Sequence, residues 1–268
     1  MAPPRDAEIN LLVLILLYCY DAYTECEWLA RRWIEDHSSE LASSGKQVEF
    51  AYMLAAAEAR QTFQLKDHSA AREAIGGVLA QLDAVELQFP GDPRIPHLKG
   101  KILARVYLFG IDPSSSVLAD SIASSRKALD WARHIAAQGD ITYQPLQISL
   151  TNNIVYCSAK LPPADTNPQE MEQLAGLLYP HTDEAHVLET VACYLYSLAR
   201  KRYEERKLGE SNGQYQRALT ELSRAIDLGI RQDINRQELT QLNIQMQHWK
   251  AEHAARFGHD GTDAPVHG

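Results

Sequence analysis

Apolar residues recur at intervals of three and four along nearly the whole chain, and no segment alternates cleanly between apolar and polar positions. A spacing of three and four places apolar side chains on one face of a helix, whereas a strand would need a period of two. The pattern therefore predicts an all-α protein. The helices that we expect cover residues Asp6–His37 with a break near Thr24, Gln47–Leu65, 70–89, Ile95–Phe109, 115–137, Pro145–Lys160, Pro168–Tyr179, Asp183–Lys207, 214–229 and Asn235–Phe257.

Residues with special backbone preferences mark the ends of these helices. Asp67 is expected to cap one helix, and Asn167 followed by Pro168 is expected to begin another. Asn235, with Glu238 three residues later, is typical of a capping box. The Ser-rich stretch 38–45 and the Gly-rich stretch 209–213 are expected to separate helices.

One helix carries a more specific pattern. Tyr215, Ala218, Leu222 and Ala225 are three, four and three residues apart, so small and large side chains share one face on which a second helix can pack closely. This spacing resembles the second helix of a tetratricopeptide repeat, although Ile230 stands where that family has a proline.

The resemblance implies a right-handed α-solenoid of about five antiparallel helix pairs, a form of tetratricopeptide-like superhelix. The repeat domain would cover residues 1–257, and the Gly/Asp/Pro/His-rich residues 258–268 would form a disordered tail. Proteins of this family bind other proteins, so the resemblance implies an interaction module.

The composition narrows the choice of partners. The 268 residues include 35 Asp and Glu against 26 Lys and Arg, a formal net charge of −9, which disfavours nucleic acid. Four cysteines without a C-x-x-C pair predict neither a zinc site nor a disulfide framework, and reduced thiols indicate a cytoplasmic protein. The apolar segment Ile9–Tyr20 is about half as long as a membrane span requires. We therefore expect no metal, cofactor, nucleic acid or membrane partner.

The first helix of each pair lines the concave surface of a solenoid. Asn152, Asn153 and Tyr156 lie within about one turn of each other, and paired asparagines inside a helix suggest a hydrogen-bonding role. In relatives that bind a peptide carboxylate, Asn and Lys or Arg of these helices make the contact. The resemblance thus implies a groove in which positive charge comes from three other residues, Lys101, Arg105 and Arg200. The alternative is that the asparagines cap a neighbouring loop.

The two ends of the chain differ. Leu239, Leu242, Met246 and Trp249 form a single apolar stripe on the last helix, as expected of a solenoid end that faces water. The first helix is instead apolar on all sides from Leu11 to Leu17. Either the chain itself encloses this helix, which we favour, or a partner covers it. The residues expected at such a contact are Leu14, Leu17, Trp28 and Trp33.

The sequence contains only weak matches to catalytic motifs. His248 and His253 do not have the H-E-x-x-H spacing, and Cys157 lies in the middle of a helix without a glycine-rich elbow. We therefore expect a non-catalytic adaptor or regulatory subunit that binds a peptide or helix of another protein in its groove. The alternative is a structural assembly subunit that oligomerises, or docks on a larger complex, through its apolar N-terminal helix.

Overall fold

Helices account for almost all of the described chain. The computed structural model describes residues 5–162, 165–232, 234 and 236–257. It is 84% helix, and the described residues contain no strand, which confirms the all-α prediction. The α-helices are α1 (Arg5–Cys19), α2 (Tyr23–Asp36), α3 (Ser38–Ser44), α4 (Gln47–Thr62), α5 (His68–Gln88), α6 (Arg94–Leu108), α7 (Ser115–Ala137), α8 (Gln144–Lys160), α9 (Pro168–Leu178), α10 (Ala185–Glu204), α11 (Leu208–Arg231) and α12 (Arg236–Phe257), and a 3₁₀ turn, η2, covers Tyr179–His181.

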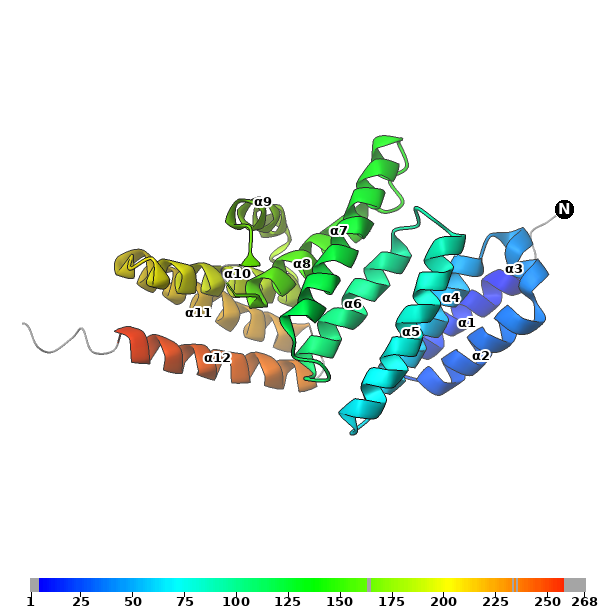
Figure 1. The fold of residues 1–268 in the computed structure, drawn as a ribbon, viewed down its shortest axis with the longest axis horizontal. Helices are drawn as coiled ribbons and strands as arrows, with labels where there is room; N and C mark the ends of the chain where they lie inside the picture. The colour runs from blue at the N-terminus through cyan, green and yellow to red at the C-terminus, as the bar shows by residue number, and fades with distance from the viewer. Residues whose placement is uncertain (1–4, 163–164, 233, 235, 258–268) are drawn as a thin grey trace, which may run out of the picture. The chain divides into compact units, whose positions relative to one another are not determined.

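The chain divides into two compact units, Met1–Asn153 and Ile154–Gly268, where the sequence predicted one repeat domain. The first unit contains α1 to α7 and the beginning of α8 (Figure 1). The second contains the remainder of α8 and α9 to α12. Residues 258–268, for which the sequence predicted a disordered tail, lie outside the described residues.

Helix α4 is the centre of the first unit, because it packs against α1, α2, α5 and α6. Its small side chains make this possible, since Ala55, Ala56, Ala57 and Ala59 are all buried. One core cluster joins α4 to α1, α2 and α3, and another joins it to α5 and α6. The helix that the chain encloses on most sides is therefore α4.

The beginning of the chain agrees with the sequence prediction at one break and differs from it at another. The expected helix Asp6–His37 is divided close to the break predicted near Thr24, by a turn in which Asp21 has a φ of 58°. The Ser-rich stretch, expected to be a loop, forms the short helix α3, which ends at Gly45 with a φ of 67°. Leu41 explains this helix, because its side chain is 2% exposed in the core between α1 and α4.

In the second unit, the predicted packing face of α11 is confirmed. Tyr215, Ala218, Leu222 and Ala225 are all fully buried, and α11 packs against α10 on one side and α12 on the other. The apolar stripe of α12 is confirmed as well, since Leu242, Met246 and Trp249 are each at most 6% exposed. Close approach of helices at small residues thus organises this unit as the sequence indicated.

Two of the predicted caps are confirmed, and one predicted break is wrong. The side chain of Asp67 accepts hydrogen bonds from the first turn of α5, and that of Asn167 does the same for α9. The Gly-rich stretch 209–213 is helical, because α11 already begins at Leu208. Ser211 is fully buried there and donates a hydrogen bond to the carbonyl of Ala199 at 2.8 Å. The predicted cap Asn235 lies outside the described residues.

Helices α6 and α7 approach each other closely at Gly100. Ser121 of α7 donates a hydrogen bond to the Gly100 carbonyl at 2.7 Å, and a Cβ at Gly100 would lie 2.5 Å from the Ser125 Oγ. We expect Gly100→Ala to lower the free energy of unfolding by about 1–2 kcal/mol, because crowding of the interface outweighs the better helix propensity of alanine. Urea unfolding of the purified chain measures this change.

Gly76 provides the matched control. It also lies inside a helix, α5, but nothing comes within 4 Å of a Cβ built on it. Gly76→Ala is therefore expected to raise the free energy of unfolding by roughly 0.5–1 kcal/mol. Equal effects of the two substitutions would show that α6 and α7 do not approach each other as described.

Candidate functional site: a cationic groove in the first unit

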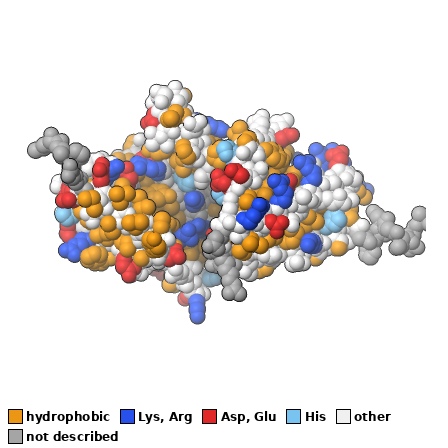
Figure 2. Space-filling model, turned by 180° about the vertical axis from the view of Figure 1, so that it is seen from behind, with side chains coloured by type: hydrophobic (Ala, Val, Ile, Leu, Met, Phe, Trp, Pro, Cys, Tyr) orange, Lys and Arg blue, Asp and Glu red, His pale blue; other side chains and the backbone are white. Residues whose placement is uncertain are grey.

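A groove opens between α1, α4 and α6, and its cavity measures about 230 Å³. Three cations from two helices line it: Arg60 of α4, and Lys101 and Arg105 of α6. Figure 2 shows Lys and Arg side chains gathered in a hollow of the surface, next to a broad area of hydrophobic side chains. The groove therefore combines positive charge with apolar walls. Its other lining residues are Ile15, Tyr18, Cys19, Tyr52, Met53, Ala56, Ala59, Phe63, Leu98 and Ile102.

The spacing of residues along α6 and α4 explains this composition. Lys101 and Arg105 are four residues apart, so they share one face of α6, while Ile102 and Leu98 on an adjacent face pack into the core. On α4, Tyr52 and Arg60 are eight residues apart and thus also share a face. Sequence reasoning found the two α6 cations but missed Arg60, because only tertiary packing brings α4 next to α6.

Burial and the neighbouring positive charges both disfavour the charged form of Lys101 in the groove. Lys101 reaches solvent, yet the protein atoms that surround it, together with the charges of Arg105 and Arg60, lower its pKa. One turn earlier, burial and the charge of Lys101 lower the pKa of His97 to about 3, so His97 is neutral near pH 7. Lys101 forms no ion pair with the described residues of the chain. An incoming carboxylate or phosphate would therefore relieve an unfavourable interaction.

Arg60 of α4 contacts α1, which forms one wall of the groove. Its Nε donates a hydrogen bond to the Tyr18 hydroxyl at 3.0 Å, and its guanidinium carbon lies 5.8 Å from the centre of the Tyr18 ring. Tyr18 in turn packs edge-on against Tyr23, with 5.3 Å between the ring centres. The aromatic wall thus holds Arg60 beside the groove, on the side opposite the α6 cations Lys101 and Arg105.

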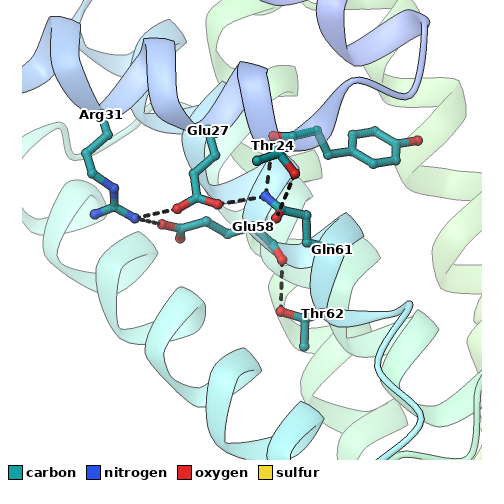
Figure 3. Close-up of polar contacts among 7 residues, drawn as sticks. Thr24, Glu27, Arg31, Glu58, Gln61 and Thr62 are labelled. Carbon is teal, nitrogen blue, oxygen red and sulfur yellow. Dashed lines mark hydrogen bonds and ion pairs between the residues drawn. The ribbon is translucent and has the colours of Figure 1, made fainter.

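A second cavity, of about 340 Å³, lies on another side of α4, between α2 and α5. Figure 3 shows the polar network along it, in which Arg31 bridges Glu27 at 3.0 Å and Glu58 at 2.5 Å. Gln61 also donates a hydrogen bond to Glu27 at 2.6 Å. Burial raises the pKa of Glu58 even though Arg31 opposes the shift. Arg31 compensates these two carboxylates, so we interpret the network as a link between α2 and α4.

Of the two predicted asparagines, Asn153 has hydrogen-bond partners on the neighbouring helix α7. Asn153 donates hydrogen bonds to Ser125 at 2.7 Å and to Ser121 at 3.4 Å, and so connects α8 to α7. Asn152 has a buried Oδ1 without a hydrogen-bond partner among the described residues. Neither asparagine lines the cationic groove. The contacts of Asn153 agree with a structural role, although with a helix in place of the loop that the sequence suggested.

Tyr156 and Arg200 belong to the second unit. The Tyr156 hydroxyl donates to a carboxylate oxygen of Glu189 at 3.3 Å, and Lys160 lies over its ring at 4.9 Å. The charge of Arg200 is one of several interactions that lower the pKa of the Glu252 carboxyl, against the effect of burial. Of the six groove residues predicted from sequence, the structure brings together only Lys101 and Arg105 in the groove.

The residues predicted for an N-terminal contact separate into buried and exposed groups. Leu14 is fully buried and Trp33 is 8% exposed, because both pack in the core around Phe50, and Leu17 is only partly exposed. Leu14 and Trp33 are therefore unavailable to a partner. Trp28 is 59% exposed, under the guanidinium of Arg32 at 5.2 Å. The expectation that the chain encloses this helix is wrong for its outer face, where Leu12 is 61% exposed.

The described side chains also bear on two other kinds of site, a cysteine nucleophile and a bound metal ion. Cys157 is fully buried, and no group of His, Cys, Asp and Glu in the described part of the chain is arranged to hold a metal ion. Among the same residues, no helix combines the length and apolar character of a membrane span. No family model, curated protein or solved structure matches this chain.

Proposed function

We propose that this protein is a non-catalytic adaptor that binds an acidic segment of another protein in the cationic groove. One observation carries the proposal: Arg60, Lys101 and Arg105 converge on a cavity whose other walls are aromatic and aliphatic. Ligand sites in proteins combine apolar walls with a few converging polar groups in this way. Although the chain has a net charge of −9, the groove concentrates positive charge, which favours a ligand with carboxylates.

We also propose that the helices form a right-handed, tetratricopeptide-like solenoid. Support comes from consecutive helices that pack as neighbours within each unit, namely α4 with α5, α6 with α7, and α10 with α11. The small-residue face of α11 supports it further. Small-angle scattering from the purified chain tests this arrangement, because a solenoid gives an elongated particle and a globular packing of the two units does not.

A peptide selection tests the groove. Random short peptides displayed on phage are selected on the intact chain, and the enriched sequences are then titrated as labelled synthetic peptides by fluorescence anisotropy. We expect the enriched peptides to carry Asp or Glu. We expect Lys101→Glu to weaken their binding about tenfold or more, since the substitution reverses a charge inside the groove.

Lys250→Glu is the matched control for this experiment. Lys250 is an exposed residue of α12 that does not line the groove, so its substitution makes the same change in net charge without changing the groove lining. The peptide affinity should be the same as for the unmodified chain. An absence of enriched sequences, or a Lys101→Glu variant that binds as tightly as Lys250→Glu, would reject the proposal.

A second candidate function is assembly through α1. The observation that favours it is the exposure of large apolar side chains on the outer face of this helix, including Leu12 at 61% and Leu16 at 56%. Such a continuous apolar face is rare on a protein that remains alone in solution.

A further inference from the structure

Helix α1 has an apolar stripe on the side that faces away from the core. Its members follow the helical spacing, and the side chains are between 37% and 61% exposed: Ile9, Leu12, Val13 and Leu16. Tyr20, the first residue after the helix, extends the stripe and is 82% exposed. The opposite face of the same helix is buried through Ala7 and Leu14. Since α1 is thus anchored on one face and apolar on the other, the outer stripe is suited to pack against another helix.

Charge is distributed unequally along one flank of this stripe. Glu8, Ile15 and Cys19 are seven and four residues apart, so they lie on the same flank of α1. Ile15 and Cys19 line the cationic groove, whereas Glu8 is exposed near the other end of the helix, about 16 Å away along the axis. Along this flank, beside the apolar stripe, the surface therefore runs from a carboxylate at one end of α1 to a groove with three cations at the other.

This pattern is complementary to itself. Reversing the direction of a second α1 places its carboxylate end beside the cationic end of the first. In an antiparallel pair related by a two-fold axis, the same flank of both helices faces the same side. With the axis between Leu12 and Val13, Ile9 of one copy lies level with Leu16 of the other, and Glu8 lies level with the segment between Ile15 and Cys19.

We propose that the occupant of the stripe is a second copy of this chain, with the two α1 helices packed antiparallel and Glu8 of each copy directed into the cationic groove of the other. The interface is isologous, so each contact occurs twice. The apolar stripe provides the association energy. The pairing of Glu8 with Arg60, Lys101 and Arg105 fixes the direction and register.

A lipid surface fits the same features less well. An anionic membrane would need the cations and the apolar stripe to meet one plane at the same time. The cations line a groove, whereas Asp6 and Glu8 are exposed on α1 itself. A flat anionic surface would therefore meet carboxylates beside the apolar stripe before it reached the cations.

Sedimentation equilibrium of the full chain, over a wide concentration range and without peptide, tests the dimer. We expect a reversible monomer–dimer equilibrium. Leu12→Glu should raise the dimer dissociation constant by about tenfold or more, because it places two carboxylates at the two-fold axis. Leu16→Glu, at an equally exposed position, should have the same effect, and circular dichroism should show both variants fully helical.

A charge swap tests the register. Glu8→Lys and Lys101→Glu should each weaken the dimer, and the double variant Glu8→Lys/Lys101→Glu should dimerise more tightly than either single variant. A chain that remains monomeric, a dimer that tolerates Leu12→Glu, or a double variant without rescue would each overturn the proposal. Binding of the monomeric chain to anionic vesicles that Leu12→Glu abolishes would also overturn it, in favour of a lipid surface.

The proposed dimer and the proposed adaptor function can be rejected independently of each other. The dimer is measured without peptide, and it does not rest on the proposed adaptor function. If both hold, the peptide and the second copy compete for Lys101, and peptide affinity should fall as the protein concentration rises.

Discussion

Replacing Leu14 with glutamate is expected to unfold the first unit. Leu14 is fully buried on the inner face of α1, in the core cluster that contains Cys26, Phe50 and Ala57. The substitution removes a leucine from this core and places a carboxyl group there without a partner, which should lower the free energy of unfolding by at least about 4 kcal/mol. Hydrogen exchange measured by mass spectrometry should show lost protection in α1, α2 and α4.

Leu12→Glu is the control that distinguishes the loss of stability caused by Leu14→Glu from the effect of an added surface charge. Leu12 is only two residues from Leu14, but it is 61% exposed, so its replacement should change the stability of the monomer by no more than about 0.5 kcal/mol. The two variants carry the same charge on the same helix and differ in the face that bears it. If Leu12→Glu lost protection as strongly as Leu14→Glu, the assignment of the inner and outer faces of α1 would be incorrect.

Tyr215→Ala is expected to produce the largest loss in the second unit. Tyr215 is among the largest fully buried side chains, and its ring contacts Tyr196 edge-on, with 5.4 Å between the ring centres. Its hydroxyl also donates a hydrogen bond to Glu252 of α12 at 2.9 Å. Removal of the ring leaves a cavity between α10, α11 and α12, which should cost roughly 3–5 kcal/mol. Exchange protection of α12 in the intact chain is the measurement.

Tyr215→Phe distinguishes packing from hydrogen bonding at the same position. It keeps the ring and removes only the hydroxyl, and Glu252 retains a hydrogen bond from Tyr196 and an ion pair with Arg256. We therefore expect a loss of about 1 kcal/mol. Similar losses for the two substitutions would mean that the link to Glu252, and not the packing of the ring, holds α12 in place.

The Leu14→Glu and Leu12→Glu variants also test what the two faces of α1 do. The inner face, through Leu14, is required for the fold of the first unit, whereas the outer face, through Leu12, is available for assembly. A variant that changes oligomeric state must therefore be chosen on the outer face. A substitution of Leu14 would reduce assembly only because it unfolds the helix that bears the stripe.

Local patterns of the sequence predicted much of the helical structure. The face formed by Tyr215, Ala218, Leu222 and Ala225 is buried as predicted, because side chains three and four residues apart must share one side of a helix. Asp67 caps its helix for an equally local reason, since its carboxylate lies next to the free backbone amides. By contrast, burial of Leu41 and Ser211 made helices of two stretches that composition alone assigned to loops.

The candidate site was only partly predictable. Lys101 and Arg105 could be grouped because they are four residues apart on one helix. Arg60 could not be added to them, since it comes from α4 and meets α6 only through tertiary packing. The asparagines Asn152 and Asn153 indicated a polar role, but the partners of Asn153 are the serines of α7. The sequence does not state which helices lie next to one another.

The sequence by itself determined that this chain is helical, where most helices begin and end, and which face of α11 and α12 is buried, because these properties depend on neighbours within a few residues. Only the tertiary structure decided that α4 is the central helix of the first unit, and that Arg60 joins Lys101 and Arg105 in one groove. It also decided which face of α1 is buried. That helix is apolar on all sides, so its sequence carries no orientation, and packing against α2 and α4 selects the side of Leu14.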